Sequence, residues 1–327
     1  MRVLVTGGAG YIGAHTALLL AERGDSVVIA DDLSTGFQKR VENLPLLRLD
    51  LAREDSHETL AKEMRKHEVD SVIHFAARKQ VAESMDKPAW YYFQNIGGVS
   101  QVLLAMEEAG VNRLVYSSSA AVYGEANGRI DEDHATRPIS PYGATKLSGE
   151  ELVTAAVQAW GLRAASLRYF NVAGAGASDL GDTETLNLVS IVLDHLMAGR
   201  PPEIFGDDYD TPDGTCIRDY VHVVDVAEAH LSVLDWLPDE PGNAIMNVGT
   251  GVGTSVQEMI AEVLKVSGSA LEPVVTNRRP GDAASVVAIV DRVAKSTGWR
   301  ARLDLAHIVK SAWESRGCIN SRPKTTV

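Results

Sequence analysis

The chain is short of cysteine and of positive charge, and each shortage excludes a class of protein. Its 327 residues include two cysteines, Cys216 and Cys318, which provide neither a disulfide framework nor metal-ligand spacing. Lysine and arginine total 31 against 44 aspartates and glutamates, so the net charge is -13 and repels polyanions. We therefore expect no metal site, no nucleic acid partner and a reducing, cytoplasmic location.

Long hydrophobic runs are also lacking. No apolar stretch reaches the ~18 residues that a membrane span needs, and residues 1–6 are too few for the apolar region of a signal peptide. Hydrophobic residues make up 45% of the chain, enough for one large domain or two ordinary ones. These features predict a soluble globular protein that does not bind membranes.

The N-terminal region has the pattern of a dinucleotide-binding unit. An apolar run at residues 2–6 leads into Gly7-Gly-Ala-Gly10-Tyr-Ile-Gly13 and a helical pattern at 14–23. Glycines there let the backbone approach a pyrophosphate at the positive end of the helix. A second predicted strand, 26–30, ends at two aspartates 18 residues after Gly13, where a ribose-binding acid is expected. Two carboxylates repel a 2′-phosphate and favour NAD over NADP; a glycine turn in another α/β protein is the alternative.

Strands and helices then alternate along the first half. We expect strands at 46–51, 70–77, 113–119 and 163–170, with helices at 53–66 and 90–109. This alternation predicts an α/β fold with a doubly wound parallel sheet of the Rossmann type. Lys79 and the serines 117–119 follow strands, at the carboxyl ends where such sheets bind ligands. We place Ser117 toward the nicotinamide and Ser119 toward the substrate, while Lys79 either reaches cofactor phosphate or is a solvated loop lysine.

Residues 140–146 contain the candidate catalytic pair. Ser140 is a predicted N-cap and Pro141 the first helical residue. Tyr142 and Lys146 are four residues apart and share one helix face. A neighbouring positive charge lowers the pKa of a phenol from about 10, which would let Tyr142 act as a general base. An ordinary surface helix is the alternative.

The sequence of the second half predicts a smaller α/β domain that binds the substrate. A glycine-rich break at 174–181 marks the boundary. Asp225 is a predicted N-cap for a helix at 226–237, which together with a strand near 220 returns to the first domain. We therefore expect the NAD-binding domain to comprise 1–172 with about 219–250, the substrate domain 173–218 and 251–316, and a disordered tail 317–327.

The glycine turn, the serine run and the Tyr-x-x-x-Lys pair occur in order on one α/β framework, and together they resemble the extended short-chain dehydrogenase/reductase family. A wider set of segments resembles the UDP-hexose 4-epimerases of that family: 11–13, 74–76, 79, 91–92, 117–124, 168–171, 204–206, 213–215, 218–222 and 278–282. The resemblance covers nearly the whole chain.

This resemblance implies a reaction. NAD is reduced and reoxidised within one turnover, and UDP-glucose and UDP-galactose interconvert at C4 through a transient 4-keto sugar. Tyr142 takes the proton of the 4-hydroxyl, Ser119 aligns that hydroxyl, and Lys146 with the cationic nicotinamide keeps the phenolate accessible. A homodimer through helices 90–109 and 146–160 is also implied.

The resemblance further implies the binding residues. For the cofactor they are Gly7, Gly10, Tyr11, Ile12, Gly13, Asp31, Asp32, Leu33, Ser34, Thr35, Gly36, Asp50, Leu51, Phe75, Ala76, Ala77, Arg78, Lys79, Asn95, Ser117, Tyr142, Lys146 and Phe170. For the UDP-sugar they are Ser119, Tyr142, Asn171, Asn187, Leu188, Ile204, Phe205, Arg218, Arg279, Asp282 and Val286. Guanidinium groups suit a diphosphate, so Arg218 and Arg279 are its expected clamp. Phe205 stacks on uracil or belongs to the core.

Two positions bear on specificity. Sugar-nucleotide dehydratases of the family carry an acidic pair directly after the active-site hydroxyl residue, where this chain has Ala120 and Ala121, which transfer no proton. Val286 stands where relatives often carry a tyrosine beside the sugar C2 substituent, so we expect turnover of UDP-GlcNAc and UDP-GalNAc as well. The alternatives are another UDP-sugar 4-epimerase, acting on UDP-glucuronate or a UDP-pentose, a net NAD-dependent oxidoreductase, and a catalytically silent binding protein.

Overall fold

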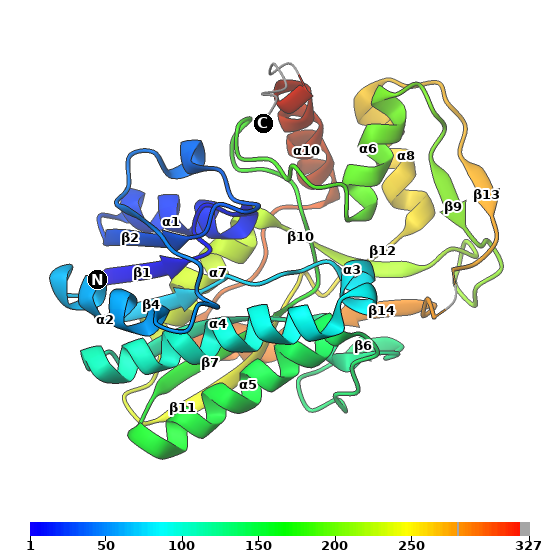
Figure 1. Cartoon of the computed structure of the whole chain (residues 1–327). Helices are drawn as coiled ribbons and strands as arrows, with labels where there is room; N and C mark the ends of the chain where they lie inside the picture. Colours follow the sequence, from blue (N-terminus) through cyan, green and yellow to red (C-terminus); the bar gives the residue numbers. More distant parts are fainter. Residues whose placement is uncertain (280, 321–327) are drawn as a thin grey trace.

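The computed structural model describes residues 1–279 and 281–320, and within them a seven-stranded parallel sheet forms the centre of the larger part (Figure 1). The order is β11-β7-β5-β4-β1-β2-β3, every neighbouring pair being parallel. The strands are β1 (Arg2–Thr6), β2 (Ser26–Asp31), β3 (Leu46–Arg48), β4 (Ser71–His74), β5 (Arg113–Ser119), β7 (Arg163–Tyr169) and β11 (Gly242–Val248). The predicted fold class is confirmed.

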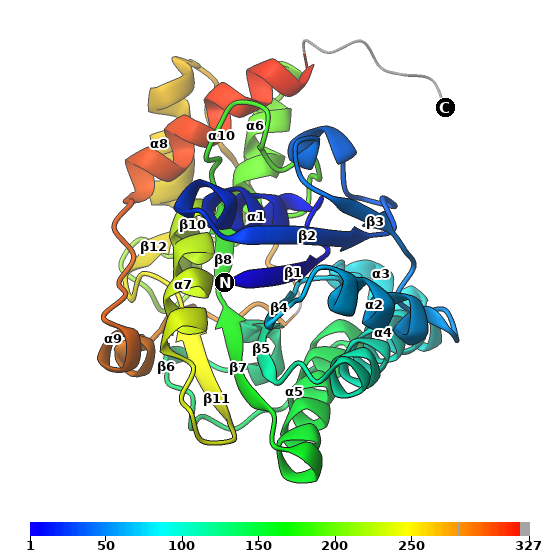
Figure 2. The same ribbon diagram turned by 90° about the vertical axis from the view of Figure 1, so that its left-hand side faces the viewer.

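Helices cover both faces of this sheet (Figure 2). One face is covered by α1 (Tyr11–Arg23), α7 (Val223–Trp236) and α9 (Asp291–Thr297), the other by α2 (Ser56–Lys66), α4 (Pro88–Ala109) and α5 (Pro141–Trp160). Val3, Leu4 and Val5 are successive residues of β1 and all are fully buried. A continuous apolar strand is what a sheet covered on both faces requires.

The smaller part contains a second, mixed sheet. Its path is β12 (Gly253–Ser255), β10 (Ile217–His222), β14 (Ser285–Ala288) and β6 (Gly128–Ile130), while β8 (Asn171–Ala173) also pairs with β10. A separate two-stranded sheet is formed by β9 (Glu203–Phe205) and β13 (Val274–Thr276). Three helices, α6 (Leu188–Met197), α8 (Val256–Ser267) and α10 (Leu305–Asn320), enclose its apolar core. The remaining elements are η1 (Gln38–Val41), α3 (Val81–Asp86) and η2 (Ala120–Tyr123).

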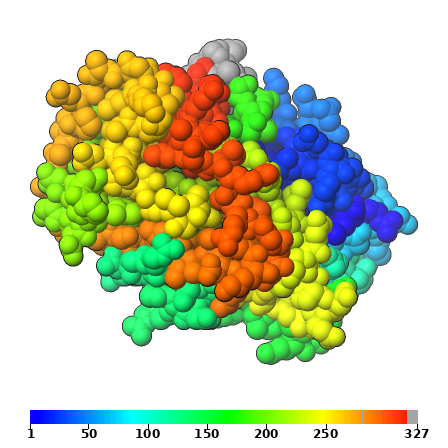
Figure 3. Space-filling view, turned by 180° about the vertical axis from the view of Figure 1, so that it is seen from behind, coloured from blue at the N-terminus to red at the C-terminus, as the bar shows by residue number. Residues whose placement is uncertain are grey.

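The chain crosses between the two parts several times. As expected, α7 packs on α1, and β11 pairs with β7 of the large sheet. The strand near residue 220, which we expected to return to the first domain with α7, is instead β10 of the second sheet, where it pairs with β8, β12 and β14. In addition, α9 packs on α7 and β11, and Val293 and Trp299 belong to the core of the large sheet, although we expected 251–316 to lie in the substrate domain. Figure 3 shows this segment, orange to red, across the back of the molecule. The division into two functional domains stays a prediction.

The start of α7 corrects one sequence prediction. Asp225 is not the N-cap, because the helix already begins at Val223 and the ring of His222 accepts a hydrogen bond from the Val224 N–H at 3.1 Å. An imidazole nitrogen can satisfy an unpaired helix N–H as a carboxylate does. Asp225 lies in the first turn and accepts a hydrogen bond from the Leu303 N–H at 3.0 Å, which ties α7 to the C-terminal segment.

Element boundaries differ elsewhere by a few residues. The strands expected at 46–51 and 70–77 end at Arg48 and His74, because the residues that follow leave the sheet and line a groove. The tail expected from residue 317 is wrong as far as Asn320, where α10 ends, and 321–327 lie outside the described residues. None of the helices in the described ranges combines the length and apolar character needed to cross a bilayer.

Candidate active site

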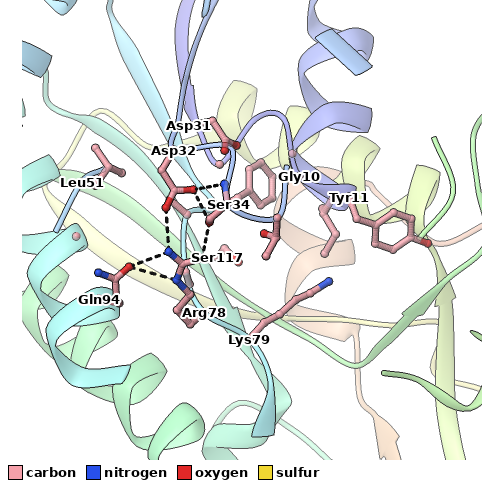
Figure 4. A pocket seen from close by; sticks show the side chains of 18 of the residues that line it. Gly10, Tyr11, Asp31, Asp32, Ser34, Leu51, Arg78, Lys79, Gln94 and Ser117 are labelled. Atoms are coloured by element: carbon pink, nitrogen blue, oxygen red, sulfur yellow. Dashed lines mark hydrogen bonds and ion pairs between the residues drawn. The ribbon is translucent and has the colours of Figure 1, made fainter. Parts of the chain in front are cut away.

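A groove opens where β1, β2, β4 and β5 end and α1 and α5 begin (Figure 4). The strand order changes direction beside β1, and such switch points bind ligands in open α/β sheets. Most predicted cofactor residues line this groove: Gly7, Gly10, Tyr11, Ile12, Gly13, Asp31, Asp32, Ser34, Thr35, Asp50, Leu51, Phe75, Ala76, Ala77, Arg78, Lys79, Ser117, Tyr142 and Lys146.

The glycine turn fits a dinucleotide phosphate. A Cβ on Gly7, whose φ is +68°, would lie 2.6 Å from the Ala76 nitrogen, and one on Gly13 would lie 2.2 Å from the Gly7 oxygen. Side chains at these positions would therefore disrupt the turn. Gly10 caps α1, and no described side chain caps this helix end, so its first-turn N–H groups are available to an anion in the groove.

Two carboxylates lie at the end of β2. Asp31 accepts hydrogen bonds from the Ala9 N–H (3.0 Å) and the Leu33 N–H (2.8 Å), and burial raises its pKa. Burial also acts to raise the pKa of Asp32, but hydrogen bonds from Ser34 and the charge of a nearby arginine outweigh burial and lower it. Two acids at this point fit a ribose with free hydroxyls, as in NAD.

The catalytic candidates meet where α5 begins beside the end of β5. Ser140 accepts a hydrogen bond from the Gly143 N–H at 3.2 Å and Pro141 follows it, so the predicted start of the helix is confirmed. Lys146 is 3% exposed and its Nζ donates to the main-chain oxygen of Ser117 at 2.7 Å.

The Ser119 hydroxyl acts to lower the pKa of Tyr142, and its Oγ accepts a bond from the Ala121 N–H at 3.2 Å. Tyr142, Lys146 and Ser117 line the groove, and Ser119 ends the strand that Lys146 contacts through Ser117.

The pKa of Tyr142 corrects the electrostatic prediction. Burial raises this pKa above its ordinary value, and the Ser119 hydrogen bond and the Lys79 charge offset burial only in part. Burial lowers the pKa of Lys146 itself to about 7. The ammonium of Lys146 is itself buried and engaged by Ser117, and Lys146 is not among the groups that lower the pKa of Tyr142. The expected joint effect of Lys146 and the cationic nicotinamide on the phenol therefore stays a prediction.

Lys79 is a loop lysine whose side chain is 42% exposed, and its ammonium is paired with carboxylates. Its ammonium lies 2.8 Å from a carboxylate oxygen of Glu184, 4.0 Å from one of Asp182 and 6.0 Å from the centre of the Tyr11 ring. Burial acts to lower the pKa of Lys79, and the two carboxylates outweigh burial and raise it. Residues 182–184 line the groove although the sequence pattern did not indicate them.

Four predicted cofactor residues are not among the described residues that line the groove: Leu33, Gly36, Asn95 and Phe170. Leu33 packs against the core of the large sheet, and a Cβ on Gly36 would lie 3.0 Å from Ala9. The amide of Asn95 binds both the N–H and the carbonyl of Arg78, at 2.7 and 3.0 Å. It therefore positions the wall of the groove.

Tyr169 lines the groove in place of its neighbour Phe170, which packs in a separate apolar cluster. Successive strand residues point to opposite faces, so one position decides which ring faces a ligand. The other lining residues that we did not predict are Ala30, Arg40, Leu49, Ala52, Gln94, Gly98, Asp182, Thr183 and Glu184.

The predicted sugar-nucleotide residues form two clusters. The Arg279 guanidinium lies 3.7 Å from the centre of the Phe205 ring. Arg218 donates to the Ala283 carbonyl at 2.8 Å and lies 3.3 Å from Asp282. Strand pairing sets Val286 opposite Arg218, on neighbouring strands of the second sheet.

The other predicted substrate residues have structural partners. Ile204 is buried and packs in the core of the smaller part, where Leu188 also packs, so neither side chain is free for a ligand. Asn187 caps α6 by accepting from the Ser190 N–H at 2.9 Å. Asn171 donates to the Asp219 carbonyl at 3.1 Å. Across the described residues there is no group of three or more His, Cys, Asp or Glu that could hold a metal ion.

Comparison with known proteins agrees with this geometry. A family model described as the NAD dependent epimerase/dehydratase family matches residues 3–249. The chain belongs to this family. The UDP-glucose 4-epimerase of Azospirillum brasilense is 45% identical over 322 residues, which cover 96% of this chain and 92% of the relative. That of Streptomyces lividans is 43% identical over 321 residues, covering 96% and 95%. The cofactor that the groove accommodates is therefore NAD.

Solved structures extend the similarity to the fold. A UDP-glucose-4-epimerase from Stenotrophomonas maltophila, with bound NAD and formylated UDP-arabinopyranose, has a TM-score of 0.93 at 38% identity and covers 98% of this chain and 99% of its own. A UDP-Glc/GlcNAc 4-epimerase from Campylobacter jejuni has a TM-score of 0.86 at 34% identity, covering 97% and 99%.

The low pKa of Lys146 predicts how stability depends on pH. Its pKa in the folded protein is about 7, whereas lysine in an unfolded chain titrates at about 10.4. Between these values the unfolded chain binds more protons, so Lys146 makes the free energy of unfolding rise with pH. Its destabilising effect is full below pH ~7 and is lost as the pH approaches ~10.4.

We therefore expect the free energy of unfolding of Lys146→Met, minus that of wild type, to be larger at about pH 6.5 than at about pH 9.5. Urea unfolding of the cofactor-free proteins measures this difference. Lys310→Met, which removes an exposed lysine of α10, is the control and should show no such trend. An equal difference for Lys146→Met at both pH values would contradict the buried, low-pKa lysine.

Proposed function

We propose that this protein interconverts UDP-glucose and UDP-galactose by epimerisation at C4, with NAD bound throughout. The observation that carries the proposal is that Tyr142 and Lys146 line the groove, with Lys146 bound to Ser117 on the strand that ends at Ser119, in a chain that belongs to the NAD dependent epimerase/dehydratase family. UDP-glucose 4-epimerases that cover nearly the whole chain support the choice of substrate.

The chain's own groups supply acid–base catalysis. NAD, when bound, contributes a cationic ring that accepts a hydride and returns it. The Ser119 hydroxyl acts to lower the pKa of Tyr142, which suits Tyr142 to take the proton of the sugar 4-hydroxyl and later give it back. Lys146 is fixed by the Ser117 carbonyl and holds the end of β5 against α5. Because burial raises the pKa of Tyr142, the phenolate depends on nearby positive charge, including Lys79.

The turn after Ser119 favours a reaction that stops at epimerisation. Ala120 and Ala121 begin the short helix η2 directly after Ser119. Neither methyl group can transfer a proton, so the keto sugar meets no acid or base there that would eliminate water. The proposed reaction therefore ends with the return of hydride to the opposite face of C4.

The second part of the molecule is the proposed binding site for the UDP group. Arg218 lies on β10 and Arg279 lies against Phe205 of β9, and both carry a planar guanidinium that suits a diphosphate. Phe205 is partly exposed under Arg279 and is available to stack on uracil. Ile204 contributes only backbone to this proposal, since its side chain is buried.

The direct test is conversion of UDP-galactose to UDP-glucose by purified protein without added cofactor. We expect turnover for wild type and a loss of about 10²–10⁴-fold for Tyr142→Phe, the range of general acid–base catalysis. Tyr92→Phe, which alters an exposed tyrosine of α4, is the control and should retain turnover. Circular dichroism and bound NAD check that Tyr142→Phe is folded and loaded.

Near-normal turnover of Tyr142→Phe would reject the assigned base. Consumption of added NAD in proportion to UDP-glucose would instead favour a net oxidoreductase. If the protein shows neither turnover nor NAD consumption, the remaining alternative is a catalytically silent binding protein. The same assay with UDP-glucuronate or a UDP-pentose as substrate tests whether the protein is one of the other UDP-sugar 4-epimerases.

The position of Val286 predicts tolerance of an N-acetyl group. Its small side chain is partly buried beside the cluster that contains Phe170 and lies opposite Arg218. The Campylobacter relative is described as a UDP-Glc/GlcNAc 4-epimerase. We expect wild type to convert UDP-GlcNAc as well as UDP-galactose, and Val286→Tyr to lose about tenfold or more on UDP-GlcNAc alone. Good activity on UDP-galactose beside none on UDP-GlcNAc in the wild type would reject this.

We also propose a homodimer through α4 and α5. Large apolar side chains are exposed on α3 and α4: Met85 at 59%, Tyr92 at 44%, Phe93 at 61% and Leu104 at 47%. Exposed apolar area of this kind is typical of an interaction surface. We expect light scattering to give the mass of two chains for wild type and of one chain for Phe93→Glu. Val252→Glu, at another exposed apolar position, should stay dimeric. A wild-type monomer at working concentration would reject the proposal.

A further inference from the structure

Arg78 makes a bridge between three separate segments. Its Nη2 donates to Asp32 at 2.9 Å, its Nη1 donates to the Ser34 hydroxyl, and Gln94 of α4 accepts at 3.1 and 3.2 Å. Figure 4 shows Arg78 directed toward Asp32 and Ser34, while Lys79 is directed toward the side of Tyr11. The side chains of Arg78 and Lys79, two successive residues, thus point in different directions along the groove.

The bridge crosses the groove because of the strand order. β1 lies between β4 and β2 in the sheet. Arg78 follows β4, and Asp32 and Ser34 follow β2, so the bond between them passes over the carboxyl end of β1 and its glycine turn. Asp31, the predicted ribose-binding acid, lies at the same end of the groove. The bridge therefore spans the groove at its adenosine end.

Both ends of the bridge are fixed. The backbone of Arg78 forms reciprocal hydrogen bonds with the amide of Asn95, and the guanidinium lies 5.2 Å from the centre of the Trp90 ring. On the other side, Asp32 also accepts from the Ser34 N–H at 2.8 Å. The side chains of Arg78 and Asp32 are only 18% and 28% exposed, so solvent screens this pair less than a surface pair.

We propose that the Arg78–Asp32 bridge retains the cofactor, so that NAD leaves the groove only when this ion pair opens. The inference rests on the proposed placement of the NAD ribose at Asp31 and Asp32. Arg78 is a positioning residue in this role, since it acts on release of the cofactor through Asp32 and Ser34.

The test compares NAD release from purified holoenzyme for wild type, Arg78→Leu and Lys87→Leu. Lys87 is the matched control: its ammonium lies 5.4 Å from the same Trp90 ring but pairs with Glu83, outside the groove. Release is measured by dilution into an enzyme that destroys free NAD. We expect about tenfold faster release for Arg78→Leu, which corresponds to ~1.4 kcal/mol, and an unchanged rate for Lys87→Leu. Added salt should speed release from wild type but not from Arg78→Leu.

A double-mutant cycle separates the bridge from general loosening of the loops. If the ion pair acts as a unit, Arg78→Leu adds little to the release rate of Asp32→Asn. The proposal would be overturned if folded Arg78→Leu released NAD at the wild-type rate. It would also be overturned if the double variant released NAD faster by the product of the two single-variant factors. Epimerase turnover is measured on the same preparations.

The two proposals then fail in different ways. A wild type that retains NAD but does not epimerise rejects only the proposed function, whereas turnover beside wild-type release from Arg78→Leu rejects only the bridge. A wild type that binds no NAD rejects the placement on which both depend.

Discussion

The bond from Lys146 Nζ to the main-chain oxygen of Ser117 is the contact on which the candidate site depends. It joins the first turns of α5 to the end of β5, and so fixes the helix that carries Tyr142 against the strand that carries Ser119. The buried lysine is costly, as its pKa of about 7 indicates, and a fold retains such a group where it positions others. The same bond therefore fixes α5 against β5 and positions the side chains that the two elements carry.

Charge in the groove is arranged locally in a protein of net charge -13. Each cation that reaches the groove from the loop after β4 meets a carboxylate from another segment: Arg78 meets Asp32, and Lys79 meets Glu184. These pairs connect the large sheet to its neighbouring loops while keeping positive charge near the expected phosphates. Burial also raises the pKa of Tyr142 in this groove. Its ability to act as a base therefore depends on the cofactor bound in the groove as much as on the charges of the chain.

Local signals were enough to predict the features that depend on local geometry. Gly13 and Ser140 have roles that neighbouring residues determine: a Cβ on Gly13 would meet Gly7, and Ser140 caps α5 as predicted. What the sequence did not show depends on distant contacts. Tyr169, the last residue of β7, lines the groove, whereas Phe170, which follows the strand, packs in a separate apolar cluster. Residues 182–184 reach the groove through a long connection, and His222 caps α7 where an acid three residues later had the usual signature.

The central claim is that one site removes a hydride from C4 of the sugar and returns it to the same carbon. UDP-galactose carrying deuterium at C4 tests this most directly, with the UDP-glucose product analysed by mass spectrometry and NMR. The account predicts that the deuterium remains on C4 of the product, because the hydride never leaves the closed groove. Loss of the label to water, or its transfer to cofactor released into solution, would contradict it.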